Sequence, residues 1–130
     1  LEKNPFTLTL SHRGNQEHAP ENSIKALKDA LKIRCDGYEI DIIFSADNVP
    51  MVIHDLNLKR LTGIDKNISE MSADDIQSFV LIGEQPSIKE YIPTLSNILK
   101  ITPDKTFLNI ELNKSSKVFL QQVPLVLVRH

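Results

Sequence analysis

Residues 6–44 read FTLTLSHRGNQEHAPENSIKALKDALKIRCDGYEIDIIF, and their pattern predicts the class of fold. It opens with five apolar or Thr residues, as a short strand does. Residues 24–33 then repeat apolar side chains at helical spacing, behind the capping candidates Asn22 and Ser23. Residues 38–44 form a second apolar run after an Asp-Gly turn signal. A strand, a helix and a strand in this order predict the βαβ unit of an α/β protein with a parallel sheet.

The rest of the chain continues the pattern less regularly. Residues 49–54 and 105–112 predict a third and a fourth strand. Other stretches predict short helices at residues 72–79 and 94–102, loops at residues 56–63 and 81–93, and a strand-like tail at residues 117–130. We expect one domain over residues 1–130, with an atypical tail at residues 114–130.

The composition excludes several classes of protein. The hydrophobic share of 41% and the charged share of 25% are ordinary for a globular protein. The net charge of −2 gives no basic field, so we expect no nucleic-acid partner. Cys35 is the only cysteine, which excludes an intrachain disulfide. There is no apolar run of 18 residues, so we expect no transmembrane segment and a soluble protein, with the cytoplasm favoured and the compartment otherwise open.

Two carboxylates share one face of the second predicted strand. Glu39 and Asp41 are two residues apart and lie roughly 6.6 Å from each other along the strand. In a half-exposed antiparallel strand this would be the solvent face. In a parallel sheet both faces are covered, and the pair would then need a cation or shifted pKa values. Glu111 on the fourth strand is a candidate third carboxylate, and oxygen ligands suit Mg²⁺ or Ca²⁺.

Two histidines follow the ends of predicted strands. His12 comes after the first strand and His54 ends the third. A single histidine at such a place is usually a polar residue leaving the core, but ligands of α/β sheets bind at the carboxyl ends of strands. Two imidazoles can act as a general acid and base, and Arg13 can make a bidentate hydrogen-bonded contact with a phosphate. Together with a cation, these residues favour phosphoryl transfer from a diester.

The chain resembles the glycerophosphodiester phosphodiesterase family over roughly residues 6–113. The resemblance rests on the order and spacing of short motifs: His12-Arg13-Gly14, Pro20-Glu21-Asn22-Ser23, Gly37-Tyr38-Glu39-Ile40-Asp41, VPMVIHD at residues 49–55, LKRLTG at residues 58–63, IPTL at residues 92–95 and LNIE at residues 108–111.

The resemblance implies a TIM barrel that hydrolyses small glycerophosphodiesters to an alcohol and glycerol phosphate. It also implies roles for eight residues: His12 and His54 as the catalytic pair, Arg13 as the phosphate contact, Glu39, Asp41 and Glu111 as ligands of Mg²⁺ or Ca²⁺, and Glu21 and Asn22 as support for the site.

The length qualifies this expectation. A TIM barrel has about 250 residues, and this chain has 130. We therefore predict the N-terminal half of a (β/α)8 barrel, with about four parallel strands and their helices. The chain is either an active enzyme or a catalytically dead, truncated remnant or interaction domain. A half-barrel would expose apolar inner residues such as Leu8, Leu10, Ile43 and Val52, so we expect a homo-oligomer.

Overall fold

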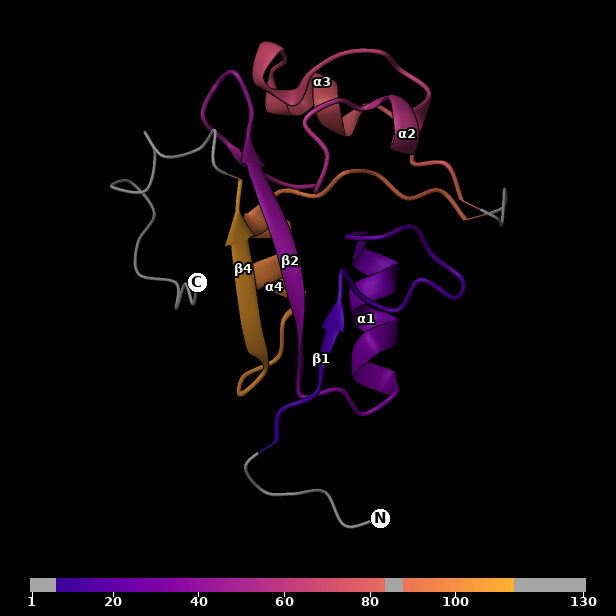
Figure 1. Ribbon diagram of the computed structural model, residues 1–130, viewed down its shortest axis with the longest axis vertical. Coiled ribbons are helices and arrows are strands. Elements are labelled where there is room, and N and C mark those ends of the chain that lie inside the picture. Colours follow the sequence, from indigo (N-terminus) through magenta and orange to yellow (C-terminus); the bar gives the residue numbers. More distant parts are fainter. Residues whose placement is uncertain (1–6, 84–87, 114–130) are drawn as a thin grey trace.

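The computed structural model describes residues 7–83 and 88–113. Their centre is a sheet in which β2 (Gly37–Phe44) pairs with the three other strands (Figure 1). β1 (Leu10–His12) and β4 (Phe107–Leu112) run parallel to β2, on opposite sides of it. β3 (Pro50–Val52) pairs antiparallel with the last residues of β2. The βαβ unit predicted from residues 6–44 is therefore present.

The prediction of four parallel strands is wrong for β3. A short turn joins β2 to β3: Ser45 N donates to Val49 O at 3.0 Å, and Asn48 has a φ of 62°. A connection of this length can only return the chain antiparallel, because a parallel pair needs a crossover of a dozen or more residues. The first strand is also displaced, since pairing begins at Leu10 and includes His12.

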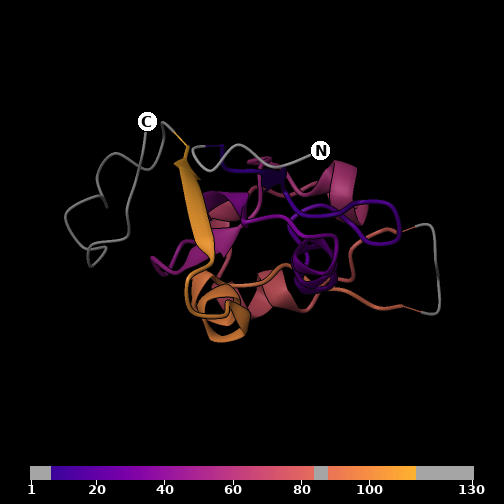
Figure 2. The same cartoon turned by 90° about the horizontal axis from the view of Figure 1, so that it is seen from below.

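The face of β2 opposite the carboxylates is covered by α1 (Ile24–Lys32) and α4 (Leu95–Ile101), which lie on the same side of the sheet (Figure 2). Both helices begin at capping hydroxyls, because Ser23 and Thr94 accept hydrogen bonds from the backbone three residues later. The buried residues between helices and sheet are Leu27, Tyr38, Ile40, Ile42, Phe44, Val52, Leu95, Ile98 and Ile110. This packing fixes which face of β2 is left for the site.

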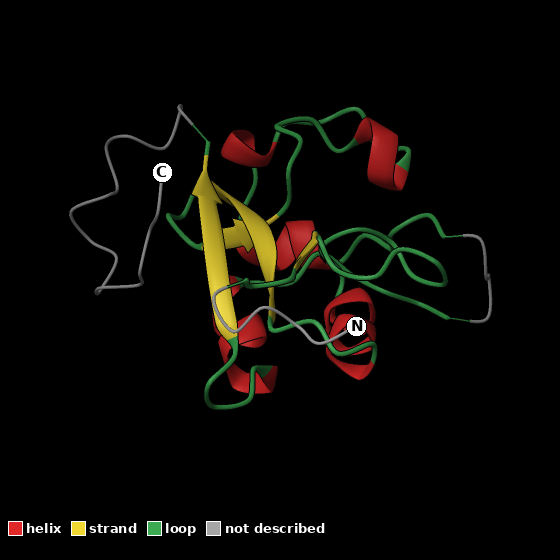
Figure 3. Ribbon diagram, turned by 60° about the horizontal axis from the view of Figure 1, so that its bottom comes forward, coloured by secondary structure: helices red, strands yellow, loops and turns green. Residues whose placement is uncertain are grey.

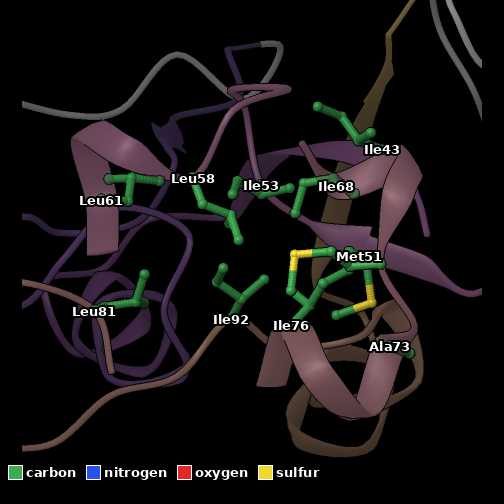
Figure 4. Packing of buried hydrophobic residues seen from close by; sticks show 11 residues of the cluster. Ile43, Met51, Ile53, Leu58, Leu61, Ile68, Ala73, Ile76, Leu81 and Ile92 are labelled. Carbon is green, nitrogen blue, oxygen red and sulfur yellow. The ribbon is translucent and has the colours of Figure 1, made fainter. Parts of the chain in front are cut away.

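An excursion between β3 and α4 builds a second apolar cluster. It contains three short helices, α2 (Lys59–Thr62), η1 (Ile68–Glu70) and α3 (Ala73–Gln77), joined by loops (Figure 3). They lie toward the end of the sheet at which the arrowheads of β1, β2 and β4 point (Figure 1). The buried residues of this second cluster are Ile43, Met51, Ile53, Leu58, Leu61, Ile68, Met71, Ala73, Ile76, Leu81 and Ile92 (Figure 4). The loop predicted over residues 56–63 is thus partly helical.

Two of the four residues predicted to line an exposed apolar inner face, Ile43 and Val52, are buried instead. Val52 is 1% exposed and packs with α1 and α4, and Ile43 is 2% exposed inside the second cluster. Leu8 is largely exposed and Leu10 is partly buried. The homo-oligomer and the single domain over residues 1–130 stay predictions. The tail at residues 114–130 lies outside the described residues.

No helix in the part of the chain that the structure describes is both long and apolar enough to cross a membrane.

Candidate active site

The register of the sheet places the predicted site residues in two rows across one face. His12 of β1 pairs with Glu39 of β2, and Asp41 of β2 pairs with Glu111 of β4. Side chains of paired residues point to the same face, and every second residue of a strand does so too. The alternation read from the sequence therefore holds, and three strands bring four predicted residues together.

Three of these side chains form a carboxylate cluster, Glu39, Asp41 and Glu111. One oxygen of each lies within 4.8 Å of the others. Glu39 is 9% exposed and Asp41 5% exposed, whereas Glu111 is exposed. Neither carboxylate oxygen of Glu39 has a hydrogen-bond partner among the described residues. Burial, and then the charges of Asp41 and Glu111, raise the pKa of Glu39 to about 7.

This cluster fits a divalent cation. Buried carboxylates without hydrogen-bond donors are costly unless a positive charge compensates them. Oxygen atoms at this spacing are the ligand type that Mg²⁺ and Ca²⁺ take. The orphaned oxygens of Glu39 are the observation that distinguishes this cluster from ordinary surface acids.

The turn after β1 is held in an unusual backbone conformation. Arg13 and Asn22 have φ values of 60° and 57°, which non-glycine residues adopt infrequently. Arg13 N donates to Glu39 O at 2.9 Å, and Asn22 N donates to Arg13 O at 2.9 Å. Gly14 is required here, because a Cβ atom on it would lie 2.6 Å from the Ala26 carbonyl carbon. These bonds fix the turn directly against the carboxylate-bearing strand.

Two side chains from this turn contact Asp41. Arg13 Nε lies 3.0 Å from Asp41 Oδ2. Asn22 Nδ2 donates to the same oxygen at 3.1 Å. Asn22 is 2% exposed, so it is a buried polar residue that orients a buried carboxylate. This contact with Asp41 is consistent with the supporting role predicted for Asn22.

Glu21 does not contact the cluster, but lies between two arginines. Its Oε1 accepts from Arg13 NH1 at 3.3 Å and from Arg60 NH2 at 2.7 Å, and its Oε2 accepts from Arg60 NH1 at 3.2 Å. Burial would raise the pKa of Glu21, but the hydrogen bonds and charge of Arg60, with the charge of Arg13, outweigh it and lower the pKa. Glu21 therefore stays ionised and holds both guanidinium groups.

The two candidate catalytic histidines belong to segments that lie along the same edge of β2, opposite β4. His12 Nε2 is 3.5 Å from Glu39 Oε2, and its side chain is largely exposed. His54 Nδ1 is 2.8 Å from Asp55 Oδ1. The residue before His54 is tied to the site strand, since Ile53 N donates to Asp41 O at 2.9 Å. Both histidine-bearing segments thus bond to the main chain of the Glu-x-Asp stretch.

Sequence reasoning gave no role to Asp55 and Arg60, although both fall within the motifs it used. Arg60 donates from Nε to Asp55 Oδ2 at 2.6 Å and from NH2 to Asp55 Oδ1 at 3.1 Å. The hydrogen bonds from Arg60, more than that from His54, lower the pKa of Asp55 to about 2. The available signals were the position of Asp55 directly after His54 and the place of Arg60 in the LKRLTG stretch, and neither signal selects the two residues as a pair.

The parallel part of the sheet thus carries a carboxylate cluster and His12 on one face, with the segment of His54 bonded to the same strand. Residues 12–127 match the model of the glycerophosphoryl diester phosphodiesterase family. The chain belongs to this family. It is 34% identical, over 110 residues, to a glycerophosphodiester phosphodiesterase of Caldanaerobacter subterraneus subsp. tengcongensis; the match covers 82% of this chain and 45% of that protein.

Solved structures support the same conclusion. The glycerophosphodiester phosphodiesterase of Agrobacterium tumefaciens superposes with a TM-score of 0.76 at 33% identity, over 82% of this chain and 47% of that one. A phosphodiesterase of Oleispira antarctica, solved with the product sn-glycerol-3-phosphate, gives a TM-score of 0.74 at 28% identity, over 91% of this chain and 53% of that one. The prediction of a partial TIM barrel is confirmed, and the chain spans about half the length of these relatives.

Proposed function

We propose that this chain carries the catalytic residues of a glycerophosphodiester hydrolase that depends on a divalent cation, Mg²⁺ or Ca²⁺. The observation that carries the proposal is the cluster of Glu39, Asp41 and Glu111, with orphaned oxygens on a buried glutamate. A cation bound there would neutralise charge on the phosphodiester as it reacts. The family membership supports diester hydrolysis in general, and the residue roles are proposals.

Arg13 would bind the phosphate from the edge of this cluster. A guanidinium has five N–H donors, and the contacts with Asp41 and Glu21 use only part of them. Those two carboxylates orient the side chain, which is 17% exposed. A pre-oriented arginine loses less conformational entropy when it binds an anion.

His12 and His54 would move the protons. One imidazole takes the proton of the attacking hydroxyl, which belongs to water or to the glycerol of the substrate. The other gives a proton to the leaving alcohol oxygen as its bond to phosphorus breaks. Their positions support a shared role, because the segments that carry them hydrogen-bond to the same edge of the carboxylate-bearing strand, at Glu39 O and Asp41 O.

The experiment is turnover of glycerophosphocholine by His12→Ala, His54→Ala and the double variant. Each single variant should lose most activity and the double variant should lose little more, as for residues that work as a unit. His18→Ala is the control, because His18 is an exposed histidine paired only with Glu17 among the contacts described. Near-normal turnover in either single variant would reject the proposed pair.

A second candidate is a remnant or interaction domain that keeps the site residues without turnover. The observation behind it is that the chain spans about half the length of the relatives it matches. Cation binding by a folded chain that shows no turnover would favour this alternative. Light scattering on the same sample tests the expected homo-oligomer, which a monodisperse monomer would contradict.

A further inference from the structure

Arg60 lies at the centre of the charged contacts around the candidate site. It belongs to the four-residue helix α2, and its side chain is half exposed. Four hydrogen bonds join its guanidinium to two carboxylates, two to Asp55 and two to Glu21. These carboxylates are separated by 34 residues in the chain, so Arg60 fastens the loop after β3 to the turn before α1. Paired forks of this kind fix geometry as well as charge.

Each carboxylate held by Arg60 contacts a candidate catalytic side chain. Asp55 Oδ1 is 2.8 Å from His54 Nδ1, and Glu21 Oε1 is 3.3 Å from Arg13 NH1. Arg60 itself contacts neither His54 nor any member of the carboxylate cluster among the described contacts. Its described contacts link it to the candidate site through Asp55 and Glu21, which is the arrangement of a positioning residue.

The contact with Asp55 determines which nitrogen of His54 carries its proton. An ionised carboxylate has no proton to donate, so Nδ1 of His54 must be the donor. Asp55 stays ionised because Arg60 holds its pKa low, at about 2. In the neutral imidazole one nitrogen is protonated and the other is free. Nε2 of His54 is then the atom left to exchange a proton.

We propose that Arg60 positions Asp55 so that His54 is locked as the Nδ1–H tautomer, with Nε2 free to act on the substrate, and that it aligns Arg13 through Glu21. The role of Nε2 rests on the proposed function. The tautomer and its dependence on Arg60 do not, because they can be observed without turnover.

The test is nitrogen NMR on the full chain labelled with ¹⁵N-histidine, near pH 8, where free imidazole is mostly neutral. His54→Gln identifies the signal. The wild type should show a protonated Nδ1, and Arg60→Gln should shift His54 toward the mixture of tautomers seen in free imidazole. Lys28→Gln, which removes an exposed positive charge from α1, should leave the signal unchanged.

Turnover gives a second measurement of the same inference. If the wild type is active, Arg60→Gln should lower kcat at least about tenfold, as when the partner of a working side chain is lost. Arg60→Lys should not restore kcat, because a lysine ammonium cannot make paired hydrogen bonds to two carboxylates at once.

Three results would overturn the inference: an Nε2–H tautomer in the wild type, an unchanged tautomer in a folded Arg60→Gln variant, or full activity of Arg60→Lys. If Arg60→Gln does not fold, Asp55→Ala replaces it, because alanine offers no acceptor to Nδ1–H, and an unchanged tautomer there also overturns the inference. A wild type without turnover rejects the proposed function but leaves the tautomer measurement valid.

Discussion

Two groups of carboxylates lie within one candidate site, and their pKa values move in opposite directions. In the cluster of Glu39, Asp41 and Glu111, burial and mutual repulsion raise the pKa of Glu39 to about 7. In the group around Arg60, the guanidinium lowers the pKa of Asp55 to about 2 and that of Glu21 below its usual value. Arg60 neutralises the second group, whereas the first group has only Arg13 Nε beside Asp41 and the exposed imidazole of His12 beside Glu39.

The difference supports the proposal of a cation at the cluster of Glu39, Asp41 and Glu111 and not at the group around Arg60. Glu21 and Asp55 each accept two hydrogen bonds from Arg60, so they gain little from further positive charge. The oxygens of Glu39 accept none from the described residues. Carboxylates whose charge is neutralised by an arginine can hold neighbouring side chains in place. Buried carboxylates without such a partner are suited to bind a cation, as proposed for the cluster.

The largest expected effect is stabilisation by the cation. Ca²⁺ or Mg²⁺ at 100 times its dissociation constant should raise the free energy of unfolding by about 2.7 kcal/mol, because the native state alone holds the site. Thermal melts with and without the cation measure this. Asp41→Asn should abolish the gain, since it removes the central ligand.

Asp74→Asn is the matched control, because Asp74 is an exposed acid on α3, outside the cluster. Stabilisation that persists in Asp41→Asn would contradict the cation site. Equal losses in both variants would mean that the ion acts on general surface charge.

The second effect is acid sensitivity of the group around Arg60. The folded-state pKa of Asp55 is about 2, below the 3.8 of an unperturbed aspartate. A depressed pKa contributes stability above the unfolded value, and this stability is lost as the pH falls toward the folded value. The loss should be on the order of 1–2 kcal/mol between about pH 4 and pH 2.

Urea unfolding of wild type and Asp55→Asn over this range measures the contribution. The two stability curves should converge as the pH falls toward about 2. Parallel curves would show that Asp55 has an ordinary pKa and that Arg60 does not hold it.

The comparison also shows what could be predicted from the sequence. The cluster could be predicted, because alternation along β2 fixes the face of Glu39 and Asp41, and the order of βαβ units brings Glu111 to the neighbouring strand. The group around Arg60 could not, since its contacts join loops and a helix of four residues. No periodicity governs such contacts, and they depend on how the excursion after β3 folds.

The direction of β3 was missed for a related reason. Its apolar run predicted a strand, but an apolar pattern does not show whether the strand runs parallel or antiparallel to its neighbour. The length of the turn between β2 and β3 did contain it, because a turn this short allows only a hairpin.

The smallest effect concerns Arg13, which contacts both carboxylate groups. Its Nε is 3.0 Å from Asp41 Oδ2, so its charge opposes a cation bound by the same carboxylate. At the effective dielectric of a site near the surface, unit charges several ångströms apart repel by on the order of 1 kcal/mol once solvent screening is included. Arg13→Gln should therefore bind the cation about two- to fivefold more tightly, even though it removes the proposed phosphate contact.

Calorimetric titration of the cation into wild type and Arg13→Gln measures this difference, and the effect should shrink as salt is added. Lys28→Gln removes an exposed charge from α1 and should leave the affinity unchanged. Weaker binding in Arg13→Gln would mean that Arg13 serves the cluster mainly by orienting Asp41. The two carboxylate groups would then be one cooperative unit, and their separation into a self-compensated part and a cation-binding part would be wrong.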